Sequence, residues 1–449
     1  MAVRGVEATR SKWEQHWDSA LSDEELRWLA HEAHITSVRL PVGYFTLGPS
    51  FAKGTPFAGP ISEVYTDAWD AVLRLCVRLY DVGIGVLLDF HALPGGANDQ
   101  DHGGTSSKKV ELWGNSKNLE LAKRCLLFMA EEIARGKIPG CVGIELCNEA
   151  CWGAKGMYEW YDDVVHAIGR VDGSIPLYIS DGWDLSTALA WCARANKRGT
   201  GCPVGVDTHK YYCFTEHDKD QSPQRIIERV QSELCEVQNV GGSVIDRGAV
   251  GVFVGEWSCV LDGESWYKSG GADRDDLVRE FGRAQSGQWR QKAGGAFFWT
   301  AKMQWMDGGE WGLIEMVKKG AVVPPGNLTL SFEDVMKRVG RAKQLVGPKR
   351  REAVDGHVGY WNSTAPGGHF EHWRFEQGWD LGFADALSFY EMRVSGNVQG
   401  AQTGADTIGS LELWILKRLR ESGQTGGFAW EWEQGVRQGV SAFMDIVTI

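Results

Sequence analysis

The chain has 449 residues and a formal net charge of −12, from 47 Lys and Arg residues and 59 Asp and Glu residues. This acidic balance argues against nucleic acid and anionic membrane surfaces as main partners. Hydrophobic residues make up 43% of the chain, enough for a sizeable core. No run of 18 apolar residues occurs in the sequence, so we expect no membrane span.

The N-terminal sequence and the cysteines both indicate a reducing compartment. The stretch MAVRGVEATRSKWEQHW lacks the apolar segment of a secretory signal. Most of the ten cysteines lie in apolar runs, which favours buried reduced thiols over disulfides. The sequence therefore predicts a cytoplasmic protein.

Seven short, nearly all-apolar runs alternate with helical patterns in the first two thirds of the chain. Such runs are typical of strands that are buried on both faces of a parallel sheet. In the helical segment 67–83, Val72, Cys76 and Leu79 recur at helical spacing. Seven strand–helix units predict an α/β fold of the (β/α)₈ barrel type with one strand unaccounted for. The predicted strands are 35–42, 84–91, 141–149, 176–181, 205–212, 250–257 and 294–300.

The barrel pattern stops near Pro324 and Pro325. We therefore expect a barrel in residues 1–325 and a mainly helical extension that packs on it in residues 326–449. Two segments of the extension, HWRFEQGWDLGFADAL and AWEWEQGVRQGVSAFM, share Glu-Gln-Gly followed by a second glycine, Gly382 or Gly439. A small internal repeat of two helices and a chance likeness between two amphipathic helices explain this equally well.

Six of the seven predicted strands carry a distinctive polar or aromatic residue at or near the C-terminal end. In a (β/α)₈ barrel these ends meet at one face, where active sites lie. Each residue alone is better explained by an ordinary core or surface role, but six in order indicate a site. The residues are Arg39, His91, Asn148 with Glu149, His209 with Tyr211, Glu256 and Trp299.

Two carboxylates at separate strand ends indicate glycoside hydrolysis. One carboxyl protonates the leaving oxygen, and the other attacks or activates water on the opposite face of the sugar. We expect partial burial to raise the pKa of Glu149 for the acid role. We expect Arg39 to keep Glu256 ionised, and Glu145 to be a structural group whose buried partner is Arg39.

The remaining strand-end residues are suited to supporting roles. Asn148 is suited to bind the 2-hydroxyl of the sugar, and the flat face of Trp299 is suited to stack on its ring. His209 and Tyr211 are placed to position one of the two carboxylates. Together these expectations describe a sugar-sized site at the barrel mouth.

The motifs VRLPVGYF, LLDFHALPGGAN, GIELCNEA, DTHKYYCF, VGEWS and FFWTAKMQW…EWGL resemble the motif series of glycoside hydrolase family 5, in particular its fungal exo-β-1,3-glucanase branch. The resemblance implies a retaining (β/α)₈ hydrolase with a β-glucan or β-glucoside substrate and with no metal or organic cofactor. It implies that Glu149 is the acid/base and Glu256 the nucleophile. The implied substrate-binding residues are Arg39, His91, Asn98, Asn148, His209, Tyr211, Phe214 and Trp299.

The chain departs from this family pattern in three places. The family begins with a strand similar to RGVNLGGWLVLE, but here VRGV runs directly into EATRSKWEQHW, which accounts for the missing strand and leaves two unpaired edges. Ala150 stands where the family has Pro. The loop after His91 carries Gln100, Asp101 and His102 where the glucanases have an aromatic residue, so other β-glucosides stay open as substrates. The C-terminal segment resembles an extension of an intracellular group of these fungal proteins.

Two other classes of function are compatible with parts of the sequence. Loss of the first strand favours a catalytically impaired barrel that binds carbohydrate or acts as a scaffold, whereas the intact Glu149 and Glu256 favour an enzyme. A metal-dependent barrel hydrolase would need clustered histidine and aspartate ligands. His91 and His209 stand alone at their strand ends, which argues against that class.

Overall fold

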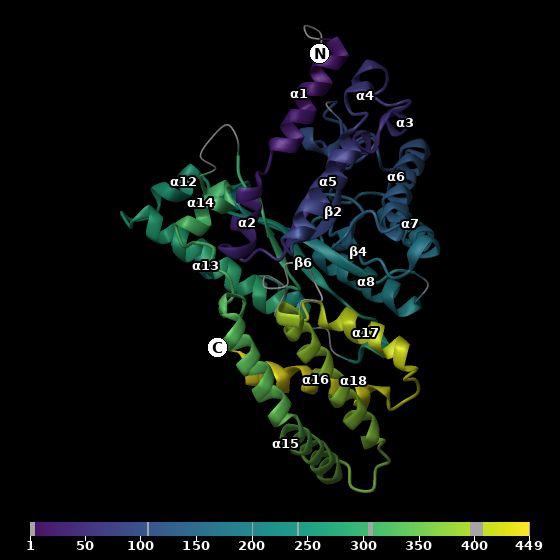
Figure 1. The fold of residues 1–449 in the computed structure, drawn as a ribbon, viewed down its shortest axis with the longest axis vertical. Coiled ribbons are helices and arrows are strands. Elements are labelled where there is room, and N and C mark those ends of the chain that lie inside the picture. The colour runs from purple at the N-terminus through teal and green to yellow at the C-terminus, as the bar shows by residue number, and fades with distance from the viewer. Residues whose placement is uncertain are drawn as a thin grey trace.

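The computed structural model describes residues 5–105, 107–199, 201–239, 242–303, 309–395 and 407–448. Its centre is a sheet of seven parallel strands, each paired with the next in chain order. The sheet curls into a nearly closed barrel (Figure 1). The strands are β1 (Ser37–Gly43), β2 (Gly85–Ala92), β3 (Cys141–Glu145), β4 (Leu177–Ser180), β5 (Val204–Tyr212), β6 (Val252–Leu261) and β7 (Ala296–Phe298).

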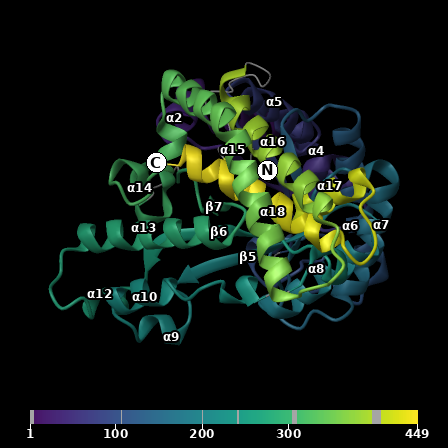
Figure 2. The ribbon, with the colours of Figure 1, turned by 90° about the horizontal axis from the view of Figure 1, so that it is seen from below.

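A helix follows each of the first six strands and covers the outside of the sheet, as Figures 1 and 2 show. The predicted helix 67–83 forms α5, which buries Cys76 and Leu79 in the core. The predicted (β/α)₈-type barrel with one strand fewer is thereby confirmed. The helices are α5 (Ala68–Asp81), α6 (Ser116–Ala134), α7 (Met157–Asp172), α8 (Leu185–Arg198), α10 (Pro223–Val230) and α13 (Arg274–Lys292).

The barrel is open between β1 and β7, which do not pair in the described part of the chain. A cavity of about 670 Å³ borders both edges and is lined by Ser37 of β1 and Ala296 of β7, among others. The segment where the motif resemblance leads one to expect a first strand instead forms helix α1 (Gly5–Ser19), none of whose residues is buried. The predicted absence of a clear first strand therefore agrees with the described residues.

The C-terminal extension forms the lower part of the molecule in Figure 1. It contains α15 (Phe332–Thr364), α16 (His372–Ser395), α17 (Leu411–Ser422) and α18 (Ala429–Val447). Glu412 of α17 accepts a hydrogen bond from the backbone N–H of Val250, at 2.8 Å. Glu433 of α18 accepts one from the N–H of Val244, at 2.7 Å. Both donors precede β6, so the extension packs against the end of the barrel where the strands begin.

The two segments with the shared residue order form α16 and α18, which pack against each other through their glycines. A methyl group on Gly378 would lie 2.1 Å from the carbonyl oxygen of Trp432, and one on Gly382 would lie 2.2 Å from that of Val436. Gly435 faces the backbone of α16 just as closely. The helices therefore run in the same direction, and their close approach requires residues without a side chain.

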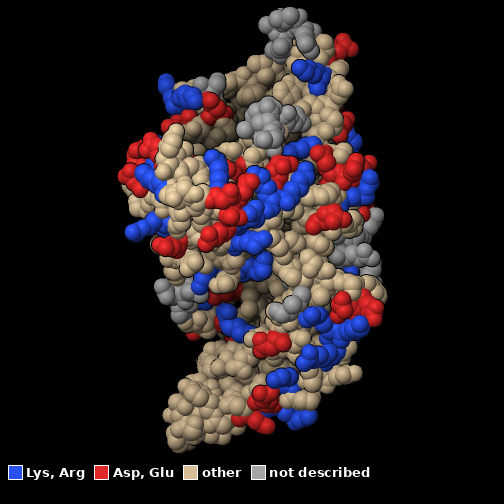
Figure 3. All heavy atoms as spheres, turned by 90° about the vertical axis from the view of Figure 1, so that its left-hand side faces the viewer, with Lys and Arg blue, Asp and Glu red and all other residues tan. Residues whose placement is uncertain are grey.

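The surface differs between the two parts of the molecule. Figure 3 shows acidic and basic side chains intermixed over much of the visible face, whereas the lower tip of the extension carries almost none. Residues 357–370, which form the end of α15 and most of the connection to α16, include no Asp, Glu, Lys or Arg. None of the helices in the described ranges combines the length and apolar character that a bilayer crossing requires.

Candidate active site

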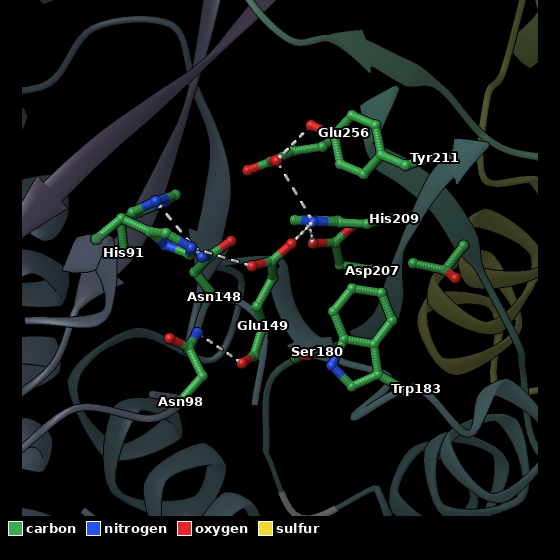
Figure 4. Close-up of polar contacts among 12 residues, drawn as sticks. His91, Asn98, Asn148, Glu149, Ser180, Trp183, Asp207, His209, Tyr211 and Glu256 are labelled. Atoms are coloured by element: carbon green, nitrogen blue, oxygen red, sulfur yellow. Dashed lines mark hydrogen bonds and ion pairs between the residues drawn. The ribbon is translucent and has the colours of Figure 1, made fainter. Parts of the chain in front are cut away.

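The strand-end residues converge at the end of the barrel opposite to the extension, in the arrangement of Figure 4. Parallel strands bring this about because all their C-terminal ends lie on one face. Within the sheet, His209 of β5 pairs directly with Glu256 of β6. Asn148 and Glu149 lie in the turn after β3, because that strand ends at Glu145 rather than at the predicted position 149.

Arg39 is the centre of the buried charges. Its Nε donates to Glu145 Oε2 at 2.6 Å and its Nη2 to Glu145 Oε1 at 3.0 Å, so the predicted pairing of these residues is confirmed. Its Nη1 donates to Glu256 Oε1 at 2.8 Å and its Nη2 to Asn148 Oδ1 at 2.7 Å. The side chain of Arg39 is only 3% exposed, and a guanidinium so deeply buried needs paired carboxylates. Burial raises the pKa of Glu145 well above its ordinary value, although Arg39 favours the charged form.

Glu256 is held by two donors from different strands. Oε1 accepts the hydrogen bond from Arg39, and Oε2 accepts one from the hydroxyl of Tyr211 at 2.7 Å. Burial and the neighbouring negative charge of Glu256 both raise the pKa of Tyr211, so its hydroxyl stays protonated and donates. The carboxylate of Glu256 is thus fixed in orientation by two hydrogen bonds, as a nucleophile requires.

Glu149 is paired with histidine. Its Oε1 lies 2.8 Å from His209 Nδ1, and its Oε2 lies 3.5 Å from His102 Nε2. Burial raises the pKa of Glu149, but the hydrogen bond and charge of His209, followed by the charges of His102 and His91, lower it below its ordinary value. The sequence-based expectation of a raised pKa is therefore wrong for this site, because it took account of burial alone.

His209 is the cation between the two candidate catalytic carboxylates. Burial lowers the pKa of His209, but the negative charges of Glu256 and Asp207 raise it. Hydrogen bonds with Asp207 and Glu149 raise it further, so the net pKa lies well above its ordinary value. His209 Nε2 lies 2.9 Å from Asp207 Oδ2, and Nδ1 lies 3.5 Å from Glu256 Oε2.

The turn that carries Glu149 has a strained backbone that polar side chains support. Glu149 has a φ of 41°, in the left-handed region. Asn98 Nδ2 donates to the carbonyl oxygen of Glu149 at 2.9 Å, and Ser180 Oγ accepts from the N–H of Ala150 at 3.1 Å. The Oδ1 of Asn98 also accepts from the backbone of Gln100. The amide of Asn98 thus holds the turn, whereas the resemblance implied that it lines the glucose pocket.

Aromatic rings surround the carboxylates. The rings of His91 and Trp299 are stacked with centroids 5.7 Å apart and planes 5° apart. Phe214 is 64% exposed and lies beside Tyr211, with ring centroids 5.4 Å apart. Trp183, in the turn after β4, is 51% exposed and projects beside Glu149 in Figure 4. Flat apolar faces of this kind are suited to contact with sugar rings.

Two overlapping residue sets here bring ligand atoms within 4.8 Å of one another, one of Glu149, His209 and Glu256, the other of Glu145, Asp207 and His209. Neither set is suited to a metal ion. Both ring nitrogens of His209 are engaged with carboxylates, and its raised pKa favours the protonated form, which cannot ligate. The guanidinium of Arg39 already supplies positive charge beside Glu145 and Asp207.

Comparison with known proteins identifies the family. A family model described as the glucan 1,3-beta-glucosidase 3 C-terminal domain matches residues 342–447. An uncharacterized glycosyl hydrolase of Saccharomyces cerevisiae is 30% identical over 439 residues, which span 95% of this chain and 79% of the yeast protein. The chain belongs to this glycosyl hydrolase family.

Other similar proteins are consistent with membership of this glycosyl hydrolase family, and we refer to the chain as the hydrolase below. The glucan 1,3-beta-glucosidase 3 of Schizosaccharomyces pombe is 29% identical over 439 residues, which span 97% of the hydrolase and 85% of that protein. The crystal structure of the rutinosidase from Aspergillus niger superimposes with a TM-score of 0.50 at 17% identity, over 68% of the hydrolase and 83% of that chain. At this level of identity, the likeness to the rutinosidase concerns the fold alone.

Sequence reasoning missed several residues of the hydrolase site. Asp89 lies 3.1 Å from Arg39 and 2.6 Å from His91, and Asp207 holds His209. Each aspartate stands two positions before its histidine on a strand, so strand alternation placed it on the same face and was a usable signal. His102 lies in the short 3-10 helix η2 (Asp101–Gly103) and Trp183 in a turn, where no periodicity points to a role; the sequence marks His102 only as a departure from the family pattern.

Proposed function

We propose that the hydrolase releases β-linked glucose from β-1,3-glucans or other β-glucosides with retention of configuration. The observation that carries this proposal is that a carboxylate oxygen of Glu149 and one of Glu256 lie within 4.8 Å of each other. Retaining glycosidases hold their two carboxyl groups about 5–5.5 Å apart, whereas inverting enzymes need about 6.5–9.5 Å to admit a water molecule. Relatives named glucan 1,3-beta-glucosidase and the motif resemblance to glycoside hydrolase family 5 support the choice of substrate.

In the first step, Glu256 attacks the anomeric carbon of the terminal glucose. The bond from that carbon to the leaving oxygen breaks, and Glu149 gives the oxygen a proton. Arg39 and Tyr211 hold Glu256 in position for the attack. The product of this step is a glucosyl ester of Glu256.

In the second step, water attacks the glucosyl ester from the side of Glu149, which now removes a proton from the water. Glucose leaves as the β anomer, and Glu256 is restored. Because His209 Nδ1 lies 2.8 Å from Glu149, a proton can pass between them, and the pair delivers one proton in each cycle.

Asn148, His91 and the aromatic residues are proposed to bind the sugar. The Oδ1 of Asn148 is engaged by Arg39, so its orientation is fixed and its Nδ2 is directed to the site, 3.5 Å from His91 Nε2. A fixed amide is suited to a hydrogen bond with the 2-hydroxyl. Trp299 and the exposed Phe214 offer apolar faces for the glucose and for the next residue of the substrate.

The test is proton NMR of the first product formed from a laminari-oligosaccharide or an aryl β-glucoside. We expect β-glucose to appear first and the α anomer to grow in only by mutarotation. Initial α-glucose would rule out double displacement. A parallel screen of β-1,3-glucans, other β-glucosides and glycolipids with the purified chain would define the leaving group.

Among the described residues β1 and β7 pair with no further strand, and these open edges favour a second candidate, a barrel that binds carbohydrate but has impaired catalysis. Titration with a glucose-like inhibitor beside a turnover assay separates the two candidates. Binding without turnover would favour the second candidate, and turnover would exclude it.

We also propose that residues 1–325 are the catalytic unit and that residues 326–449 serve mainly to pack on it. A cytoplasmic location is proposed on the basis of the cysteines. All ten are free thiols, and seven of them are buried. Fluorescence microscopy of the tagged chain tests the location, and secretion into the medium would contradict it.

A further inference from the structure

Far from the barrel mouth, two histidines and a buried glutamate meet where three helices of the extension join. His357 lies on α15, His372 is the first residue of α16, and Glu431 lies near the start of α18. His357 Nε2 is 3.0 Å from Glu431 Oε2, and His372 Nδ1 is 3.3 Å from the same oxygen. The glycosidase chemistry proposed above uses none of these residues.

We propose that His357, His372 and Glu431 form a binding site for a zinc ion that ties α15, α16 and α18 together. The three ligand atoms all lie within 4.8 Å of one another. Zinc bonds of about 2.0–2.2 Å to nitrogen and oxygen place neighbouring ligands of a tetrahedral ion about 3.3–3.5 Å apart. The two measured distances to Glu431 are therefore close to what a shared ion requires, and small side-chain shifts complete the fit.

The orientation of each ligand is already fixed by its neighbours. The ring of His357 stacks on Phe375, with centroids 4.0 Å apart and planes 12° apart. The ring of His372 stacks on Phe370, with centroids 5.5 Å apart and planes 12° apart. The other oxygen of Glu431 accepts a hydrogen bond from the N–H of Glu371 at 2.7 Å. Outer contacts of this kind orient the ligands of metal sites and strengthen binding.

The hydrogen bonds within this cluster do not satisfy all of its buried polar atoms. Glu431 is fully buried, and in the described ranges its ion-pair contacts are to the two histidines alone. His372 Nδ1 is buried yet makes no hydrogen bond with any described residue. A buried carboxylate without a firm cationic partner is costly, and a divalent cation between it and two neutral imidazoles would remove that cost.

The site is accessible to an ion. The side chain of His372 is 26% exposed. His357 also lines a cavity of about 590 Å³ between α15 and α18, together with Tyr360 and Gln434. Three protein ligands leave a fourth position for water, as in zinc sites that are open on one side.

Zinc binding by the full chain tests the proposal. Protein that has been stripped with a chelator and desalted is titrated at neutral pH against a chromophoric zinc chelator. We expect one tightly bound equivalent, which His372→Ala weakens at least about 100-fold, since even the outer partners of zinc ligands are worth 10–100-fold. Zinc should also raise the unfolding temperature of the wild-type chain and leave that of His372→Ala unchanged.

Two further variants make the result specific. Glu431→Gln keeps an oxygen that can accept the N–H of Glu371 but removes the anionic ligand, so it should fold and lose the tight equivalent. His369→Ala removes a neighbouring histidine that packs on Phe428, with ring centroids 5.2 Å apart, and should bind zinc as the wild type does. Circular dichroism checks that each variant is folded.

Cobalt gives an independent readout, because a four-coordinate cobalt ion has strong visible absorption bands. We expect these bands in the wild-type chain and in His369→Ala, and their loss in His372→Ala. Equal zinc affinity in the wild type and His372→Ala, or the absence of a tight equivalent, would overturn the proposal and leave the cluster as hydrogen-bonded histidines.

Discussion

His209 Nδ1 lies 2.8 Å from Glu149 Oε1, so the proposed acid/base of the hydrolase is paired with a cation. The pKa of His209 is raised well above its ordinary value, and that of Glu149 is lowered. One proton therefore belongs to the pair rather than to either residue. The pH dependence of turnover and of stability should therefore reflect the titration of the His209–Glu149 pair.

A His209→Gln variant should change the pH dependence of turnover. In the wild-type chain, the pair keeps its proton until the pH rises through the raised pKa of His209. Glutamine cannot bind this proton, so in the variant Glu149 is the sole carrier of the proton. Glu149 therefore loses the proton at a lower pH than the wild-type pair does. We expect the alkaline limb of kcat/KM to move to lower pH and kcat to fall about 10–100-fold from lost positioning. A pH–rate profile with an aryl β-glucoside measures both.

His166→Gln, on the exposed side of α7, is the matched control and should leave the profile unchanged. An alkaline limb that stays in place in His209→Gln would contradict the shared proton.

The same pair should make stability depend on pH. A raised pKa of His209 stabilises the fold fully below its ordinary pKa of 6.5, and this contribution is lost as the pH rises through the raised value. A lowered pKa of Glu149 stabilises the fold above its ordinary value of 4.5, and this contribution is lost as the pH falls through the lowered value. Between these two values, the unfolding temperature of the wild type should exceed that of His209→Gln by the largest margin. A constant difference across the pH range would contradict the pKa directions.

Replacement of Glu256 by Gln should abolish turnover and leave the fold intact. Glutamine fills the same volume, and its one carbonyl oxygen can still accept the hydrogen bond from Arg39 while its NH2 group faces the oxygen of Tyr211, but it cannot form the glucosyl ester. We expect kcat to fall at least about 10⁴-fold, as removal of a nucleophile does in other enzymes. Glu264→Gln, an exposed residue after β6, is the control and should retain full activity. Measurable turnover close to the wild type in Glu256→Gln would refute the role of Glu256.

Arg39→Met should destabilise the barrel as well as inactivate it. The variant leaves Glu145 buried without its cation, a loss of about 3–5 kcal/mol in the free energy of unfolding. The double variant Arg39→Met with Glu145→Leu removes both partners of the pair and should recover part of that stability but none of the activity, since Glu256 still lacks its hydrogen bond from Arg39. Urea unfolding and an aryl glucoside assay measure the two effects. If the double variant is no more stable than Arg39→Met, the pairing with Glu145 does not account for the loss.

Gly435→Ala should loosen the packing of α18 on α16. The added methyl group would lie 2.1 Å from the carbonyl oxygen of Phe375, so the helices must move apart. We expect a loss of about 1–3 kcal/mol in the free energy of unfolding, typical of overpacking. Gly340→Ala on α15, where a methyl group meets nothing within 4 Å, should instead stabilise the chain by up to about 1 kcal/mol. Equal effects of the two substitutions in thermal unfolding would show that helix propensity alone decides.

The sequence by itself determined the barrel class and the strand-end residues of the candidate site. Apolar runs at regular intervals specify strands that must be buried, and parallel strands bring their C-terminal ends together whatever the details of packing. Arg39, Glu149 and Glu256 could therefore be selected from strand ends. The matching glycines of the extension could also be identified in the sequence, but their role in the close packing of α16 on α18 could not be predicted from it.

Only the tertiary structure decided how these groups act on one another. It placed Arg39 within 4 Å of four carboxylates, those of Asp89, Glu145, Asp207 and Glu256. It also paired Glu149 with His209, which reversed the expected direction of the Glu149 pKa. In the described part of the chain it left β1 and β7 unpaired with each other, and it brought together His357, His372 and Glu431, which no periodicity connects. The physical reason is that burial can be read from local patterns, whereas the energy of a charge depends on distances of a few ångströms to groups that are remote in the chain.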